Sequence, residues 1–405
     1  MRVQVIATGS VHTGVLPGHG LPGLDAAAPA SYGGWRPRAI LGADSPGGLQ
    51  LPAAAPVAGQ LYAPRAAWTD GQIVVAADTG NHRVMIWHGV PTTDGLPADV
   101  VLGQPDEHTE GPAASGLGPA VGMHLPTGVL VHGGRLVVAD AWHHRILVWD
   151  TVPTVTGTPP DRVLGQVDAH HVEANRGGEA DAASFYWPFG IAVIDGRFYV
   201  ADTGNRRVLV WRDGIPTTDR PADVVLGQPG PADREENRGG EARADSFRWP
   251  HDVAGAKGGI VVADAGNHRL LRWARHPETD CPADAVLGQP NMTASMEFPY
   301  ISQAGRFRFP YAVSTVPGGA MAVADTANNR VLIYASVEAS HDDAPDAVLG
   351  QPTFAANGEN RWAQVATDTL CWPYGVHWHP GGGDAPDLLL VADSGNNRIA
   401  IWERP

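Results

Sequence analysis

The chain has very little cysteine, with Cys281 and Cys371 as the two thiols among 405 residues. They lie far apart and no Cys-x-x-Cys pair exists, so the sequence supports neither a disulfide framework nor a thiolate zinc site. No apolar stretch approaches the roughly 20 residues that span a bilayer. The first ten residues hold one basic residue and only a brief apolar run, which is too short for the hydrophobic region of a signal peptide. We therefore expect a cytoplasmic protein.

Positive charge is also scarce. Lys and Arg together number 28 against 43 Asp and Glu, which gives a formal net charge of −15. Because phosphate backbones are bound through Lys and Arg with release of counterions, this balance disfavours nucleic acid and anionic membranes as partners.

Turn-forming residues, in contrast, are abundant. The chain has 50 glycines and 35 prolines, while 43% of its residues are hydrophobic. A disordered chain would be poorer in apolar residues. The combination favours many short strands joined by specific turns.

One segment recurs six times. It reads Val-Ala-Asp-Thr-Gly-Asn-Arg-Arg-Val-Leu-Val-Trp at 200–211, and the other copies lie at 75–87, 138–149, 262–273, 323–334 and 391–402. Its aspartate falls at positions 78, 140, 202, 264, 325 and 393, with spacings of 62, 62, 62, 61 and 68. A fixed period of this kind is typical of a repeat architecture.

Each unit is predicted to form four strands. A first strand follows an aromatic-Pro entry, as in 187–193, and a second ends at Val-Ala-Asp. Thr-Gly-Asn then supplies a tight turn, because Gly and Asn tolerate positive φ. A third strand ends at Trp or Tyr, and the run 99–104 with its copies gives a fourth. Four strands per unit predict a propeller blade.

The two ends of the chain predict how the ring closes. The last unit stops at Trp402 without its fourth strand, and an unmatched copy of that strand, 38–42, precedes the first unit. Pairing the two would complete the sixth blade and remove exposed edges. We expect an all-β, six-bladed β-propeller over 37–405. Residues 1–36, rich in Gly, Pro and Ala, form an N-terminal extension that could fold over one face.

These motifs resemble the NHL-repeat family, through the Asp-x-x-Asn-x-Arg-Val core and the preceding Pro-x-Gly-(Ile/Val)-Ala-Val entry. The recurrent Val-Leu-Gly-Gln-Pro is similar to a group of bacterial NHL proteins. The resemblance covers about 38 to 402 and implies the propeller fold. It leaves function open, because one fold hosts unrelated activities.

Residues that occur in every unit are predicted to be structural. An active site needs one copy of its groups, whereas a hairpin needs its Asp, Asn and Arg in each blade. The closing Trp or Tyr is expected to pack between blades. The Asn-Arg-Gly-Gly-Glu segments at 175–179 and 237–241 are interpreted as matched loop turns, with an anion cradle as the alternative.

The residue after each entry proline breaks the repeat. We expect these side chains to converge near one end of the central channel: Arg65, Thr127, Phe189, His251, Tyr311 and Tyr374. Arg65 could bind a carboxylate or phosphate, His251 could exchange a proton, and the tyrosines could donate or stack. A channel plugged by satisfied side chains is the alternative.

The segment Pro250-His251-Asp252 is similar to the entry found in the peptidyl-amidating lyase branch of NHL propellers. That resemblance implies a channel histidine that binds catalytic zinc. The branch uses several such histidines, and here His251 is the one histidine at the matched positions.

The second break lies in the hairpin Ala141-Trp-His-His-Arg145, which lacks the Gly or Ala and the Asn of the other copies, so we expect a strained or altered turn. Six histidines are expected in this sector of the entrance face, namely His108, His124, His143, His144, His170 and His171. Of these, His124, His143, His170 and His171 are candidate ligands of a divalent metal such as Zn²⁺. Solvated loop histidines are the alternative.

Together these features predict a small-molecule pocket at the channel mouth, walled by the long loops 104–123, 167–185 and 229–247. The predicted binding residues are Arg65, Thr127, Phe189, Trp249 and Trp372, and the predicted catalytic residues are His251, Asp252, Tyr311 and Tyr374. With Asp252 behind His251, a metal-assisted lyase or hydrolase is the reaction class that this set indicates. The alternative is a non-catalytic module whose loop face docks another protein.

Overall fold

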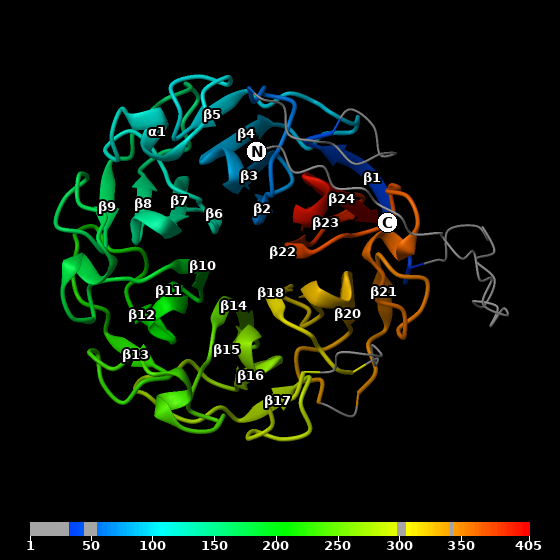
Figure 1. Ribbon diagram of the computed structural model, residues 1–405. Coiled ribbons are helices and arrows are strands. Elements are labelled where there is room, and N and C mark those ends of the chain that lie inside the picture. Colours follow the sequence, from blue (N-terminus) through cyan, green and yellow to red (C-terminus); the bar gives the residue numbers. More distant parts are fainter. Residues whose placement is uncertain (1–31, 44–54, 298–304, 341–342) are drawn as a thin grey trace, which may run out of the picture. The chain divides into compact units, whose positions relative to one another are not determined.

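Six four-stranded antiparallel sheets surround a common centre in the computed structural model (Figure 1). The structure describes residues 32–43, 55–297, 305–340 and 343–405, which belong to one compact unit spanning Ser31–Pro405. This architecture is the predicted six-bladed propeller. Among the described residues, no helix has both the length and the apolar character needed to cross a membrane.

The strands of blades one to five run from the centre outward in chain order, whereas β1, from the start of the chain, is the outermost strand of blade six. Blade one is β2 (Ala66–Thr69), β3 (Ile73–Asp78), β4 (Arg83–His88) and β5 (Val100–Leu102). Blade two is β6 (Val129–His132), β7 (Arg135–Asp140), β8 (Arg145–Trp149) and β9 (Arg162–Leu164). Blade three is β10 (Pro188–Ile194), β11 (Arg197–Asp202), β12 (Arg207–Trp211) and β13 (Val224–Leu226). Blade four is β14 (Pro250–Ala256), β15 (Gly259–Asp264), β16 (Arg269–Trp273) and β17 (Ala285–Leu287). Blade five is β18 (Pro310–Thr315), β19 (Met321–Asp325), β20 (Arg330–Tyr334) and β21 (Ala347–Leu349). Blade six is β22 (Pro373–His379), β23 (Asp387–Asp393), β24 (Arg398–Arg404) and β1 (Arg36–Leu41).

Short helical turns connect these strands. A 3-10 turn joins the second and third strands of every blade, at Thr79–Asn81, Ala141–His143, Thr203–Asn205, Ala265–Asn267, Thr326–Asn328 and Ser394–Asn396. The loops between blades contain α1 (Pro112–Gly116) and the turns Ala174–Gly177, Glu236–Gly239 and Glu359–Trp362.

The ring closes as predicted. Strand β1 pairs antiparallel with β24, so that residues from near the two ends of the chain share blade six (Figure 1). Glu403 strengthens this seam by accepting hydrogen bonds from Arg36 and Arg38 at 2.9 and 2.8 Å. Most of the predicted N-terminal extension, residues 1–31, lies outside the described residues.

Hydrophobic cores lie between neighbouring blades. The described residues form six buried clusters, and each joins two consecutive sheets, including blade six with blade one. The aromatic residue that ends the third strand is fully enclosed in every blade: Trp87, Trp149, Trp211, Trp273, Tyr334 and Trp402. These residues have the packing role that their repetition predicted.

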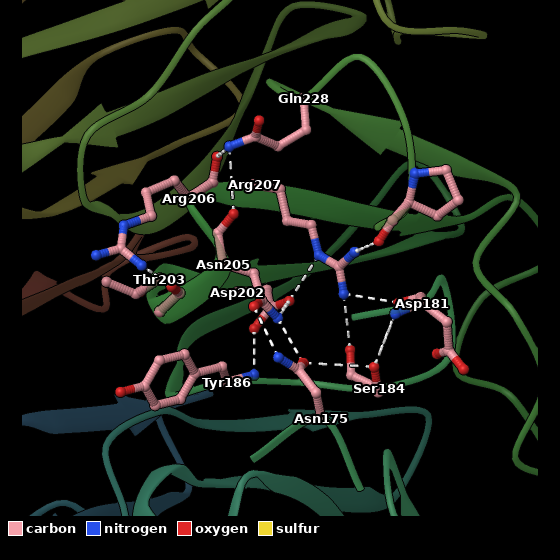
Figure 2. Close-up of polar contacts among 12 residues, drawn as sticks. Asn175, Asp181, Ser184, Tyr186, Asp202, Thr203, Asn205, Arg206, Arg207 and Gln228 are labelled. Atoms are coloured by element: carbon pink, nitrogen blue, oxygen red, sulfur yellow. Dashed lines mark hydrogen bonds and ion pairs between the residues drawn. The ribbon is translucent and has the colours of Figure 1, made fainter. Parts of the chain in front are cut away.

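The repeated Asp, Asn and Arg hold the hairpin of each blade together (Figure 2). In blade three, Oδ2 of Asp202 accepts hydrogen bonds from Asn205 and from Nε of Arg207, both at 2.7 Å. Its Oδ1 accepts the backbone N–H of Tyr186, also at 2.7 Å. The terminal nitrogens of Arg207 donate to loop carbonyls, including that of Ser184 at 2.9 Å. Each buried charge is thus paired and hydrogen-bonded, which offsets its desolvation cost.

The loops between blades are bonded to the same hairpins. Asn175 and Asn205 exchange side-chain hydrogen bonds at 3.0 and 2.8 Å (Figure 2), and Arg176 donates to the carbonyl of Ala183 at 2.7 Å. The Asn-Arg-Gly-Gly-Glu segment therefore closes its own loop, as its interpretation as a matched turn predicted.

The hairpin prediction was wrong in one respect. Neither Gly nor Asn of Thr-Gly-Asn has positive φ; the left-handed residue is the one that follows Asn. The glycine is needed for space instead, since a Cβ on Gly204 would lie 2.3 Å from the carbonyl oxygen of Tyr186. The expected strain in blade two is also absent, because His144 has φ 54° and ψ 44°, as its equivalents do. His143 replaces Asn, with Nδ1 2.9 Å from Oδ2 of Asp140.

Candidate functional site

Each inner strand begins at or shortly after a proline, and the preceding hairpin holds four of these prolines in place. The hydroxyl of Thr79 donates to the carbonyl of Pro126 at 2.7 Å, and that of Thr326 to the carbonyl of Pro373 at 2.6 Å. The residue after each proline lies at the channel. The structure brings the six predicted positions to the wall of one cavity of about 610 Å³: Arg65, Thr127, Phe189, His251, Tyr311 and Tyr374.

Five of these side chains touch one another in a closed circuit. The ring centroids of Phe189 and His251 lie 4.7 Å apart, those of His251 and Tyr311 4.3 Å, and those of Tyr311 and Tyr374 4.6 Å. The guanidinium carbon of Arg65 completes the circuit, 4.8 Å from the Tyr374 ring and 5.4 Å from the Phe189 ring. The predicted convergence is confirmed, and the side chains narrow this end of the channel.

Arg65 is the one cation of this circuit. Besides Phe189 and Tyr374, its guanidinium faces the ring of Trp142 at 5.5 Å. Within the described part of the chain, no carboxylate or carbonyl accepts a hydrogen bond from it. Burial lowers the pKa of Arg65 below its usual value. A guanidinium with five donors, surrounded by rings and without an acceptor, is a ready site for an anion.

Thr127 supports the site from within the wall. It is buried, and its hydroxyl lies 3.2 Å from the carbonyl oxygens of both Pro188 and Phe189. Four other hairpins carry a Thr or Ser whose hydroxyl donates to the carbonyl of an entry proline, whereas the hairpin of this blade has Ala141. Thr127 thus supplies the hydroxyl that the entry of β10 would otherwise lack. The hydroxyl of Thr127 therefore donates its hydrogen bond to the backbone.

His251 is neutral in this setting. Its Nδ1 lies 3.1 Å from the carbonyl oxygen of Trp249, which can only accept, so the proton is on Nδ1 and Nε2 is unprotonated. Burial lowers the pKa of His251 to about 4, with a smaller contribution from the charge of Arg65. The expected partnership with Asp252 is not formed, because the carbonyl of Trp249 is the bonded group.

Asp252 lines the cavity next to His251. Its Oδ1 accepts the N–H of Val253 at 2.9 Å and its Oδ2 that of Val313, on the neighbouring β18, at 3.0 Å. Burial raises the pKa of Asp252 to about 7, against the opposing effect of these two hydrogen bonds. A carboxyl with this pKa exchanges protons near neutral pH.

The entry to blade four is held differently from the other five. At those junctions, the side chain of the left-handed hairpin residue accepts the N–H of the residue before the entry proline. The acceptors are His82, His144, His268, Asn329 and Asn397, at 2.9–3.2 Å. Arg206 takes this place before blade four, and a guanidinium cannot accept. The altered junction coincides with the Pro-His-Asp entry.

Two parts of the site were missed by sequence reasoning. Trp142 reaches the circuit from the blade-two hairpin, with its ring 5.9 Å from that of Phe189. The signal was present as a Trp in a position that elsewhere holds Gly or Ala. Farther along the cavity, Trp68 and His377 line the wall with ring centroids 5.8 Å apart, and nothing in the repeat marked them.

Trp249 and Trp372 do not line the cavity. The ring of Trp249 stacks on that of Phe309 at 6.2 Å, and the indole of Trp372 donates to Glu359 at 3.0 Å. A binding role for these two residues stays a prediction.

The predicted metal ligands do not gather into one site. The rings of His124 and His143 are 5.5 Å apart, but Nδ1 of His143 already contacts Asp140. His170 and His171 lie on an exposed loop, where Nδ1 of His171 contacts Asp168 at 2.7 Å. Across the described residues, no three His, Cys, Asp or Glu side chains form a group that could hold a metal ion. A bound metal stays a prediction.

Comparison with known proteins supports the NHL relationship. The model of the NHL repeat matches residues 247–273, which run from the entry of blade four to the end of its third strand. NHL repeat-containing protein 2 from Bos taurus is 29% identical over an alignment of 168 residues, with 35% of this chain and 18% of the relative covered. The chain thus matches less than a fifth of that protein's length.

Two solved structures resemble the fold. A protein of unknown function from Bacteroides thetaiotaomicron is 12% identical, with 91% of this chain and 75% of that chain covered and a TM-score of 0.49. A streptogramin B lyase is 10% identical, with 93% and 100% covered and a TM-score of 0.47. At these TM-scores we derive no argument from either likeness.

Proposed function

We propose that this protein binds a small molecule with an anionic group in its channel, with Arg65 as the anchor. The observation that carries the proposal is a guanidinium that faces three aromatic rings at one cavity and has no acceptor among the described residues. Arg65 is half-buried, so its donors are accessible from the cavity, and an incoming carboxylate or phosphate would accept from two of them at once.

Catalysis on the bound molecule is the wider form of the proposal. His251 offers an unprotonated Nε2, and Asp252 offers a carboxyl with a pKa of about 7. Such a pair suits proton transfer in a lyase or hydrolase reaction. The metal-assisted form of that reaction stays a prediction.

Protein docking on the loop face is the second candidate. It is favoured by Trp362, which is 77% exposed, and by Trp372, ten residues further along the chain, which is 38% exposed. Exposed aromatic residues of this size are enriched in protein interfaces.

Arg65→Met tests the anchor. Titration calorimetry with hexanoate and with hexyl phosphate should show binding to the native chain and an affinity at least about tenfold weaker in the variant, since a charge-assisted pair contributes roughly 1.5–3 kcal/mol. The melting temperature should change little, because Met keeps the apolar contact with the three rings, and Arg65 has no hydrogen-bond acceptor to lose in the described part of the chain.

Arg248→Met is the matched control. Arg248 also lies over an indole, that of Trp249 at 5.0 Å, but it does not line the cavity. Its substitution should leave binding of both probes unchanged. Equal affinity of native and Arg65→Met protein for both anions would contradict the proposal.

A further inference from the structure

The charges along the cavity are unevenly paired. Four side chains with a formal charge line it, namely Arg65, Asp195, Asp252 and Lys257. Asp195 contacts Nε2 of His276 at 2.9 Å, and Lys257 forms an ion pair with Glu338 at 3.3 Å; both partners lie outside the cavity lining. Within the described residues, Arg65 and Asp252 have no charged partner. The two unpaired charges therefore have opposite signs.

The fold does not require a carboxylate at position 252. The equivalent position, two residues after the entry proline, is small in the other five blades, where it is Ala66, Gly128, Gly190, Ala312 or Gly375. Those blades close the ring without a charge there. Gly190 also makes room for the carboxylate, because a Cβ on it would lie 2.6 Å from Oδ1 of Asp252.

Neither charge is balanced by an opposite charge, although Asp252 does connect blade four to blade five through the N–H of Val313. Asp252 accepts one backbone N–H on each oxygen, which leaves lone pairs on both oxygens. Arg65 donates to no described group. Both groups lie half-buried at the wall of one cavity, so a ligand that enters the cavity would supply the missing partner of each charge.

We propose that the channel ligand is a zwitterion, whose anionic group binds Arg65 and whose ammonium group binds Asp252. This inference rests on the proposed function and adds the class of ligand, an ω-amino acid. The aromatic wall of Phe189, Tyr311 and Tyr374 offers an apolar surface for the carbon chain that joins the two charged groups. His251 is neutral and does not compete with either charge.

The test is a matched series of probes on the full chain. Calorimetry compares hexanoate, hexylammonium and the ω-amino acids 4-aminobutyrate, 6-aminohexanoate and 8-aminooctanoate, each up to about 10 mM, which detects complexes in the millimolar range. At least one ω-amino acid should bind about tenfold tighter than hexanoate, since it makes a second charge-assisted contact.

Two variants separate the contributions. Asp252→Asn keeps an oxygen that can accept from Val313, and it should abolish the advantage of the ω-amino acid while hexanoate binding is unchanged. Arg65→Met should weaken hexanoate and ω-amino acid alike. Circular dichroism and urea unfolding confirm that both variants are folded.

The outcomes distinguish the two proposals. If no ω-amino acid exceeds hexanoate, or if Asp252→Asn retains the advantage, the zwitterion is ruled out while Arg65-dependent anion binding stands. If binding of hexanoate does not depend on Arg65, or if no probe binds, both proposals are overturned.

Discussion

At the scale of the residue, function is best sought where one copy of a repeated position carries a side chain that the fold does not need. Trp362 is such a residue on the loop face. The equivalent turns end in Gly177 and Gly239, with φ of 76° and 78°, whereas Trp362 adopts φ 57° with 77% of its side chain exposed. A left-handed conformation costs a non-glycine residue about 1–2 kcal/mol. An exposed indole buries little apolar surface, so burial offsets little of this cost.

Trp362→Gly should therefore stabilise the protein, by about 1 kcal/mol after the entropy lost by glycine is counted. Urea unfolding measures the free energy difference. The converse substitution, Gly239→Ala, is the control, because no atom lies within 4 Å of the added Cβ and only the backbone conformation is tested. It should destabilise by a similar amount. A loss of stability in Trp362→Gly would show instead that the indole supports the loop.

At the scale of the element, the hairpin of one blade fixes the first strand of the next. Nδ1 of His144 accepts the N–H of Trp187 at 3.2 Å, and Asn329 does the same for Trp372 at 2.9 Å. Histidine and asparagine thus accept the same backbone hydrogen bond at equivalent hairpin positions, and both are tolerated in the left-handed region.

His144→Asn should consequently leave the free energy of unfolding within about 0.5 kcal/mol of native. His144→Leu removes the acceptor and should cost about 1–3 kcal/mol, the penalty of an unsatisfied amide. Thermal and urea unfolding of the two variants side by side check this difference. Equal stabilities of the Asn and Leu variants would mean that the ring serves packing alone.

The blades, their strand order and the closure by β1 were predictable, because the Asp, Asn and Arg of the hairpin recur in every unit. The positions that face the channel were predictable for the same reason. It was not predictable that His251 and Asp252 both line the cavity, because consecutive residues of a regular strand point to opposite faces of the sheet. The register shift between Pro250 and Asp252 that lets both line the cavity leaves no mark in the sequence. The direction of the Trp142 side chain was equally hidden, because a rotamer decides it.

At the scale of the whole molecule, enclosed histidines link stability to pH. Burial lowers the pKa of His251 and of His377 to about 4, and it likewise lowers the pKa of the hairpin residues His82, His144 and His268. Between pH 6.5 and 4 the unfolded chain binds protons at these positions and the folded protein does not. Their contribution to stability is therefore full above pH 6.5 and is lost as the pH falls. Asp252 acts in the opposite direction, because its raised pKa lets the folded protein hold a proton between pH 7 and 3.8.

The free energy of unfolding, measured by urea titration at intervals from pH 7 to pH 4.5, should consequently fall with the pH. His377→Gln keeps a donor for the carbonyl of Thr69, which Nε2 of His377 contacts at 2.9 Å, and removes one titrating ring. It should flatten the slope by about 1 kcal/mol per pH unit, the effect of one proton. Asp252→Asn should steepen the slope by a similar amount, because the opposing group is lost. If the slopes of the two variants do not change in these opposite directions, neither His377 nor Asp252 is responsible for the pH dependence. The sensitivity to acid would then come from the histidines of the hairpins.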